Sequence, residues 1–121
     1  MKKILIVEDE PDILDVIKLT LDIGNYQLST AANGDLALEM ARQEMPDMIL
    51  LDIMLPGKID GLEVCRQLKG DEATKGIYIM IVTAKGMQGD KEVGFAAGCD
   101  QYIVKPFKIM RLMREIEKIL G

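Results

Sequence analysis

The feature that most constrains this 121-residue sequence is a run of four apolar residues, Met48 to Leu51, that ends directly on Asp52. Because polar and apolar residues do not alternate in it, the run is typical of a strand buried on both faces, as in the middle of a parallel sheet. Asp52 would then lie at the carboxyl end of that strand, where open α/β sheets bind their ligands. An Asp that only caps a turn is the alternative, and the rest of the chain must decide.

Four more segments read as strands, at residues 3–7, 26–31, 77–82 and 101–104, and all but the second are largely apolar. Between and after the strands, apolar residues recur at helical spacing, which predicts helices after Pro11, over 36–41, from Asp60-Gly61, over 88–97 and over 109–120. Gly89 and Gly94 are expected inside the fourth helix, where glycine lowers helix stability. Five strands alternating with five helices indicate a doubly wound α/β sandwich.

Composition excludes several classes of function. A formal charge of −5 and a pI near 4.7 argue against direct binding to nucleic acid or to an anionic membrane. The first apolar run is too short for a signal peptide or a transmembrane helix, so we expect a cytoplasmic protein. The sequence has no histidine, which removes imidazole catalysis. Cys65 and Cys99 lack metal-ligand spacing and are expected to be small buried hydrophobes.

Polar residues follow four of the predicted strands: Glu8-Asp9, Asp52, Thr83 and Lys105. The carboxyl ends of parallel strands meet at one edge of the sheet, so these side chains should converge. Two carboxylates about 4 Å apart repel by roughly 4 kcal/mol at an effective dielectric constant near 20, and one lysine cannot neutralise three of them. An oxygen-rich site suits Mg²⁺. The alternative is inert, with the acids capping a helix and Lys105 pairing with Asp52.

A hard cation beside a carboxylate, a hydroxyl and an ammonium group is the equipment for phosphoryl transfer to a carboxylate. Asp52 would attack phosphorus in line, Thr83 would donate a hydrogen bond, and Lys105 would neutralise the phosphoryl oxygens. Glu10 is expected to be solvated.

The sequence resembles the receiver domain of two-component response regulators, and the resemblance covers residues 1–121 as one domain. The motifs that carry it are Glu8-Asp9, Asp52-Ile53-Met54-Leu55-Pro56, Asp60-Gly61, Val82-Thr83-Ala84 and Tyr102-Ile103-Val104-Lys105-Pro106-Phe107. The resemblance implies a flavodoxin-like (βα)5 fold with five parallel strands in the order 2-1-3-4-5. It also implies a signalling domain rather than an enzyme in the usual sense, with self-catalysed phosphorylation and dephosphorylation.

In this family the matching residues divide the chemistry among them. Asp52 would accept a phosphoryl group from a sensor histidine kinase or a histidine phosphotransfer protein. Mg²⁺ would be held by Glu8, Asp9, Asp52 and the backbone carbonyl of Met54. Lys105 would pair with the phosphoryl group.

The resemblance also implies how the signal leaves the site. Thr83 and Tyr102 would form the switch pair, in which the hydroxyl moves towards the phosphate and the ring swings inward. The readout would be the face of the fourth helix, fifth strand and fifth helix, which binds a downstream effector domain or protein. The Lys105-Pro106 bond is cis in the family.

Three alternatives from other classes remain. The first, an interaction domain that is not phosphorylated, would have no need to keep all five active-site residues. A phosphatase with an aspartyl nucleophile would need a general acid two residues after it, where this chain has Met54. A flavin module would need phosphate-binding residues in place of Glu8-Asp9-Glu10. The loop 52–60 departs from the family by one extra residue, at Lys58 or Ile59.

The closing helix departs from the family in its charges. In winged-helix DNA-binding relatives, basic residues of the fourth helix pair with an acid on the fifth helix. An acid before the fifth strand pairs with an arginine on the fifth helix. This chain keeps Lys91 and Asp100 but has Arg111 and Glu115 as their partners. The predicted contacts are repulsive, so we expect a monomer or a weak dimer.

Overall fold

The computed structural model describes residues 1–22 and 24–121, and its core is one five-stranded parallel sheet in the order β2-β1-β3-β4-β5. The strands are β1 (Lys2–Val7), β2 (Tyr26–Ala31), β3 (Met48–Leu51), β4 (Tyr78–Thr83) and β5 (Gln101–Val104). The helices are α1 (Pro11–Asp22), α2 (Gly34–Glu44), α3 (Gly61–Gly70), α4 (Asp90–Ala96) and α5 (Ile109–Leu120). The predicted flavodoxin-like (βα)5 sandwich is confirmed.

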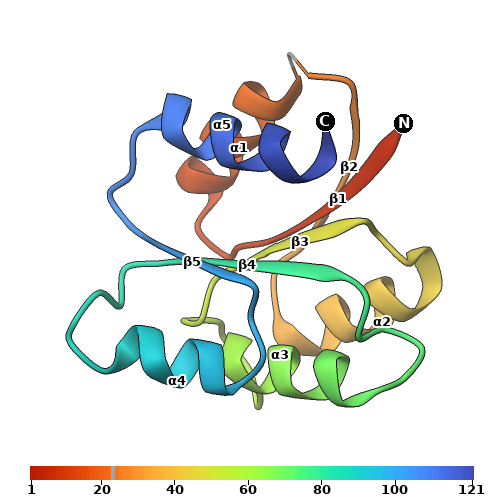
Figure 1. Cartoon of the computed structure of the whole chain (residues 1–121), viewed down its shortest axis with the longest axis vertical. Helices are drawn as coiled ribbons and strands as arrows, with labels where there is room; N and C mark the ends of the chain where they lie inside the picture. The colour runs from red at the N-terminus through yellow and green to blue at the C-terminus, as the bar shows by residue number, and fades with distance from the viewer. Residues whose placement is uncertain (23) are drawn as a thin grey trace.

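The helices cover both faces of the sheet. In Figure 1, α1 and α5 lie above it and α2, α3 and α4 lie below it. Side chains alternate along each strand, so each face has its own apolar cluster. Ile49 and Leu51 pack on the side of α2 and α3, while Met48 and Leu50 pack on the side of α1 and α5.

Burial on both faces explains the unbroken apolar run of β3. This strand lies between β1 and β4, in register from Ile4 opposite Met48 to Val7 opposite Leu51. All four of its residues are buried. Full burial of a side chain of this size is worth about 1.5–3 kcal/mol, so a shift of the strand along its axis would be costly. The residue after the strand, Asp52, is therefore held in a defined place.

The fourth helix differs from its prediction. It spans Asp90–Ala96 and is shorter than the expected 88–97. The expectation that Gly89 lies inside the helix is wrong, because Gly89 is the N-cap and has a left-handed φ of 98°. Glycine reaches that region without the steric cost that a Cβ imposes, so the helix begins after it. Gly94 lies inside the helix as expected and is buried.

Lys69 ties the amino-terminal ends of two strands to α3. Its Nζ donates to the carbonyl oxygens of Lys75 at 3.1 Å and Ile77 at 2.7 Å, just before β4. The same Nζ lies 2.8 Å from Asp100 Oδ2, just before β5. Asp100 Oδ2 also accepts from the amide of Ile79 at 2.8 Å. This network joins α3, β4 and β5 at the edge of the sheet opposite to Asp52.

Cys65 and Cys99 are buried and free, as predicted. Burial raises the pKa of Cys65 to about 12 and that of Cys99 to about 11, so both thiols stay protonated at neutral pH. Within residues 1–22 and 24–121, no helix combines the length and the apolar character needed to cross a membrane.

Candidate functional site

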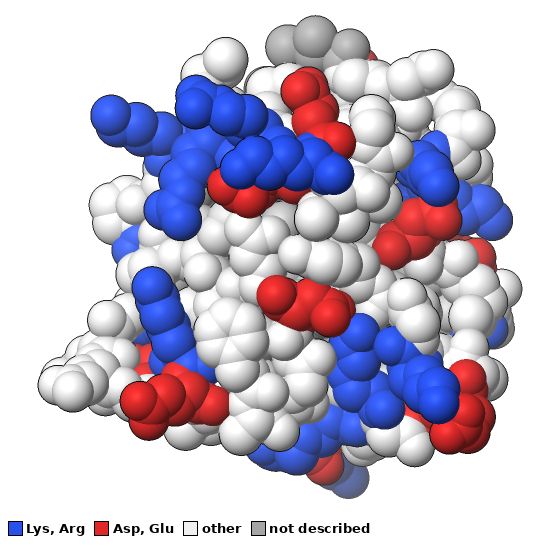
Figure 2. All heavy atoms as spheres, viewed as in Figure 1, with Lys and Arg blue, Asp and Glu red and all other residues white. Residues whose placement is uncertain are grey.

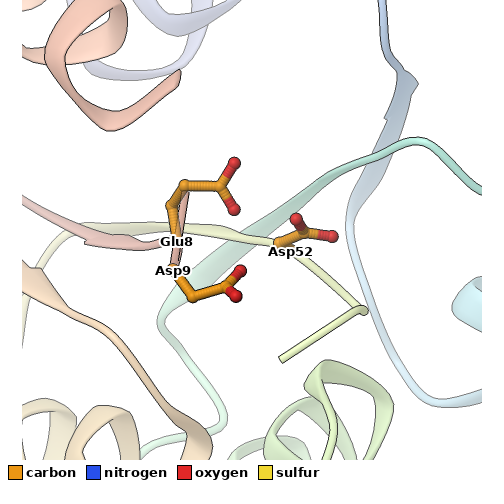
Figure 3. Close-up of side chains that lie close together, drawn as sticks. All are labelled: Glu8, Asp9 and Asp52. Carbon is orange, nitrogen blue, oxygen red and sulfur yellow. The ribbon is translucent and has the colours of Figure 1, made fainter. Parts of the chain in front are cut away.

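The acidic residues predicted to converge do so at the carboxyl ends of two adjacent strands. Glu8 and Asp9 follow β1, and Asp52 follows β3. The amide of Asp52 donates to the carbonyl oxygen of Val7 at 3.1 Å. One carboxylate oxygen from each of the three lies within 4.8 Å of the others. Figure 3 shows the three carboxylates gathered beyond these strand ends. Glu8 and Asp52 are buried, whereas Asp9 is exposed to solvent.

Lys105 enters the cluster from the end of β5. Its Nζ lies 2.5 Å from Glu8 Oε1 and 3.0 Å from Asp52 Oδ2. The lysine side chain is only 11 % exposed, so these charge-assisted hydrogen bonds are shielded from water. The peptide bond from Lys105 to Pro106 is cis, as the family resemblance implied.

The cluster shifts the pKa values of its members in different directions. Burial raises the pKa of Glu8 to about 7, and the neighbouring Asp52 adds to the shift. Burial also acts to raise the pKa of Asp52, but the neighbouring Glu8 side chain, the Met54 amide, Lys105 and Thr83 outweigh it and hold this pKa below its usual range. Burial acts to lower the pKa of Lys105, but its two carboxylate partners raise it overall. Asp52 is therefore the ionised carboxylate of the pair near neutral pH.

The donor set fits a hard divalent cation. Among the described residues, Glu8 Oε2 is the buried side-chain oxygen or nitrogen atom without a hydrogen-bond partner. A buried polar atom left without a partner is costly, which indicates a further ligand. Three carboxylates face one ammonium group, so the site carries excess negative charge. Oxygen ligands without nitrogen or sulfur suit Mg²⁺.

Met54 joins the site through its backbone. Its amide donates to Asp52 Oδ1 at 3.1 Å, which holds that carboxylate in one orientation. The side chain of Met54 is 55 % exposed and points no acid or base at Asp52. This bond keeps the backbone of Met54 beside Asp52.

Thr83 and Tyr102 are both buried, and the residue that links them was not predicted from the sequence. The backbone amide of Lys85 donates to Thr83 Oγ1 at 3.4 Å, and its carbonyl oxygen accepts from the Tyr102 hydroxyl at 2.5 Å. Burial raises the pKa of Tyr102 to about 12, so its hydroxyl remains a donor. The backbone of one residue, Lys85, therefore connects the hydroxyl of Thr83 to that of Tyr102.

Gly61 is a second residue whose importance sequence reasoning missed. A Cβ there would lie 2.1 Å from the carbonyl oxygen of Asp52 and 2.8 Å from Ile53 Cα. The start of α3 can approach the backbone that follows β3 only because this position lacks a side chain. The Asp60-Gly61 pair was noted as a helix start and as one of the motifs of the family resemblance, but not as a close backbone approach, which leaves no mark of its own in one sequence.

Comparison with known proteins decides the family. The family model described as "response regulator receiver domain" matches residues 4–117. The chain belongs to this family. The receiver domain is thus a signalling domain of a response regulator, as the resemblance implied.

Relatives of known name are longer proteins. The receiver domain is 38 % identical over 120 residues to the DNA-binding dual master transcriptional regulator RpaA of Synechocystis sp., covering 99 % of this chain and 49 % of that protein. It is 45 % identical over 120 residues to the response regulator ArlR of Staphylococcus saprophyticus, covering 99 % of this chain and 53 % of that protein. The chain spans about half the length of these relatives. A DNA-binding relative means that the expectation of no nucleic-acid binding is not supported for a whole protein of this kind.

Solved structures agree on the fold. The receiver domain of a sensor histidine kinase from Pseudomonas aeruginosa is 34 % identical, with a TM-score of 0.89, and 99 % of this chain and 98 % of that chain are covered. That structure has a magnesium ion coordinated in its active-site cleft. Receiver domains bind Mg²⁺ in their acidic pocket, and this receiver domain has an acidic cluster at the carboxyl ends of β1 and β3.

The raised pKa of Glu8 predicts a pH-dependent effect of Glu8→Gln on stability. A proton on Glu8 stabilises the fold, fully so below the unfolded pKa near 4.5, and this contribution is lost as pH rises through about 7. Glutamine does not titrate, so with chelator present the variant should gain stability over the unaltered protein between these pH values. The gain at pH 8 should be on the order of 3 kcal/mol.

Urea denaturation at pH 4.5, 6, 7 and 8 measures this difference. Glu10→Gln, at an exposed carboxylate, is the control and should show no such trend. A difference between Glu8→Gln and the unaltered protein that is constant over this range would contradict the assignment.

Proposed function

We propose that Asp52 is the residue of this receiver domain that accepts the phosphoryl group, from a histidine kinase or a histidine phosphotransfer protein. The observation that carries the proposal is the setting of its carboxylate, which is 4 % exposed, ionised, oriented by the Met54 amide and paired with Lys105 at 3.0 Å. A nucleophile that is charged and held in one orientation is prepared for in-line attack.

Each neighbour of Asp52 has a role in the transfer. A carboxylate oxygen of Asp52 forms a bond to phosphorus while the bond from phosphorus to the donor nitrogen breaks, and the nitrogen leaves with the bonding electrons. Lys105 neutralises charge on the phosphoryl oxygens, and the Thr83 hydroxyl donates to one of them. Both residues already lie against Asp52, so little rearrangement precedes the transfer.

The acidic cluster supplies the metal site of this proposal. Glu8, Asp9 and Asp52, with the backbone carbonyl of Met54, would hold Mg²⁺, directly or through water. When bound, the ion supplies positive charge for the phosphoryl oxygens, which a single lysine cannot match. The orphaned oxygen of Glu8 supports this role.

The domain would catalyse its own phosphorylation and dephosphorylation, and it would act on no separate substrate. An aspartyl phosphatase is the alternative. The exposed thioether at Met54, where such enzymes carry a general acid, disfavours it. We also propose that residues 1–121 form one receiver unit and that it works in the cytoplasm.

The signal would leave through the backbone of Lys85. A phosphoryl group that accepts a hydrogen bond from the Thr83 hydroxyl and draws it inward would move Thr83 Oγ1 away from the Lys85 amide that now donates to it, and the carbonyl of Lys85 holds Tyr102. A ligand shifts a conformational equilibrium only by its differential affinity for the two states, and Thr83 is the group that can sense the phosphoryl group. The face of α4, β5 and α5 would pass the change to an effector domain or protein.

Charge on this face supports a monomer or a weak dimer. Figure 2 shows lysine and arginine side chains gathered over α5. Lys91 and Arg111 are exposed and would repel each other across the dimer contact used by winged-helix relatives. The expected clash of Asp100 with Glu115 has less support, because Asp100 pairs with Lys69 and Glu115 accepts from Gln101 at 3.0 Å.

Incubation with acetyl phosphate and Mg²⁺ should add one phosphoryl group to the protein at Asp52. Intact mass spectrometry detects the adduct, because one phosphoryl group adds about 80 Da to the protein. Asp52→Asn should abolish the adduct, and chelator should suppress it. An adduct that persists in Asp52→Asn would place the acceptor elsewhere.

Thr83→Ala should still become phosphorylated, although more slowly, and should lose the response of Tyr102 and α4. Hydrogen exchange before and after addition of beryllofluoride, a phosphoryl mimic, measures the response. Thr74→Ala, another buried threonine, controls for a lost hydroxyl away from the site. Equal exchange changes in Thr83→Ala and the unaltered protein would show that the signal takes another route.

Sedimentation of the beryllofluoride-treated protein at micromolar concentration should give a monomer or a weak dimer. The double change Arg111→Glu with Glu115→Arg replaces repulsion by attraction and should strengthen association. A tight dimer that this double change weakens would reverse the proposed sense of the charges.

A further inference from the structure

Ile59, in the loop between β3 and α3, lies against the first turn of α2. Ile59 is half-buried and packs with the core, whereas Pro56, Gly57 and Lys58 before it are exposed. Its counterpart is Gly34, the buried first residue of α2. A Cβ on Gly34 would lie 2.6 Å from Ile59 Cγ1 and 3.0 Å from both Cδ1 and the carbonyl oxygen of Ile59. The two segments touch this closely because Gly34 has no side chain.

The same loop is bonded to the site at its other end. The amides of Leu55 and Gly61 both donate to the carbonyl oxygen of Ile53, at 3.0 and 2.9 Å. The amide of Met54 donates to Asp52 Oδ1. Leu55 and Gly61 are thus held at the two ends of residues 56–60 by the same carbonyl oxygen. Support for residues 56–60 has to come from another element. Ile59 against Gly34 provides a support that reaches a different helix.

We propose that the contact of Ile59 with Gly34 is a positioning device for the metal and acceptor site. Ile59 touches neither the phosphoryl group nor the metal. It holds the loop against α2 so that Met54 keeps its amide on Asp52 and its carbonyl at the edge of the acidic cluster. The loop carries its extra residue at Lys58 or Ile59, so the longer loop contains its own anchor. The inference rests on the proposed function, since it assigns Met54 to the metal site.

Four proteins test the contact: the unaltered chain, Gly34→Ala, Ile59→Ala and the double variant. Titration calorimetry with MgCl₂, in the absence of any phosphoryl donor, measures Mg²⁺ affinity. Each single change should weaken binding on the order of tenfold, as is usual when a group that supports metal ligands is lost. The closest contact created by Gly34→Ala is with Cγ1 of Ile59, and only the 3.0 Å approach to the Ile59 carbonyl oxygen remains once that side chain is removed. The double variant should therefore bind much less weakly than the sum of the two single losses implies.

Two measurements separate positioning from a general loss of stability. Gly76→Ala is the matched control, because a Cβ there meets no atom within 4 Å, and it should bind Mg²⁺ as the unaltered protein does. Hydrogen exchange should be faster at the Leu55 and Gly61 amides in Ile59→Ala, while β1 and β4 stay protected. Ile59→Val, which removes Cδ1 alone, should show the same changes in smaller measure if Ile59→Ala folds poorly.

The outcomes that overturn the inference differ from those that overturn the function. Affinity like that of the unaltered protein in both single variants, or additive losses in the double variant, would overturn the positioning role alone. Absence of Mg²⁺ binding by the unaltered protein would overturn the proposed function and the positioning role with it.

Discussion

Repulsion among three carboxylates is the constraint on which this structure depends. The strand order places β1 beside β3, and the two strands end in register. The residues that follow them, Glu8, Asp9 and Asp52, therefore lie close together. A sheet buried on both faces is stiff enough to hold like charges at this separation. Lys105 from β5 offsets part of the repulsion, and Glu8 takes up part of it through a raised pKa. The repulsion that remains favours the binding of a cation at this site.

The segments around the acidic residues pack closely against one another, and each contact depends on a glycine. Gly61 lets α3 reach the backbone of Asp52, and Gly34 lets the loop before α3 reach α2. Gly94 does the same for the ring of Tyr102, because a Cβ there would lie 2.8 Å from Tyr102 Cδ2. At each place glycine gives up helix propensity in exchange for contact between segments distant in sequence.

Some of this could be predicted and some could not, for physical reasons. The run from Met48 to Leu51 required burial on both faces, which led to the parallel sheet and placed Asp52 at its edge. Lys105 and Thr83 followed from the same geometry. The link through Lys85 could not be foreseen, because it is made by the backbone, which every residue shares. Gly89 was misplaced inside α4 because helical spacing carries no sign of a left-handed φ.

The contact of Ile59 with Gly34 is also a feature that could not be predicted from the sequence. A sequence shows that a loop is longer than usual, but it does not show which neighbouring element supports the added length. Only the fold reveals that α2 begins beside that loop, and that a residue without a side chain stands there.

The network around Lys69 makes the two edges of the sheet unequal. At the amino edge, one ammonium group binds two carbonyl oxygens and a carboxylate, and so joins α3, β4 and β5. At the carboxyl edge, by contrast, Lys85 is exposed and held by two hydrogen bonds. In the proposed function, a displacement that starts at Thr83 would therefore reach Tyr102 and α4 through these two hydrogen bonds, while the network around Lys69 holds the other ends of β4 and β5 in place.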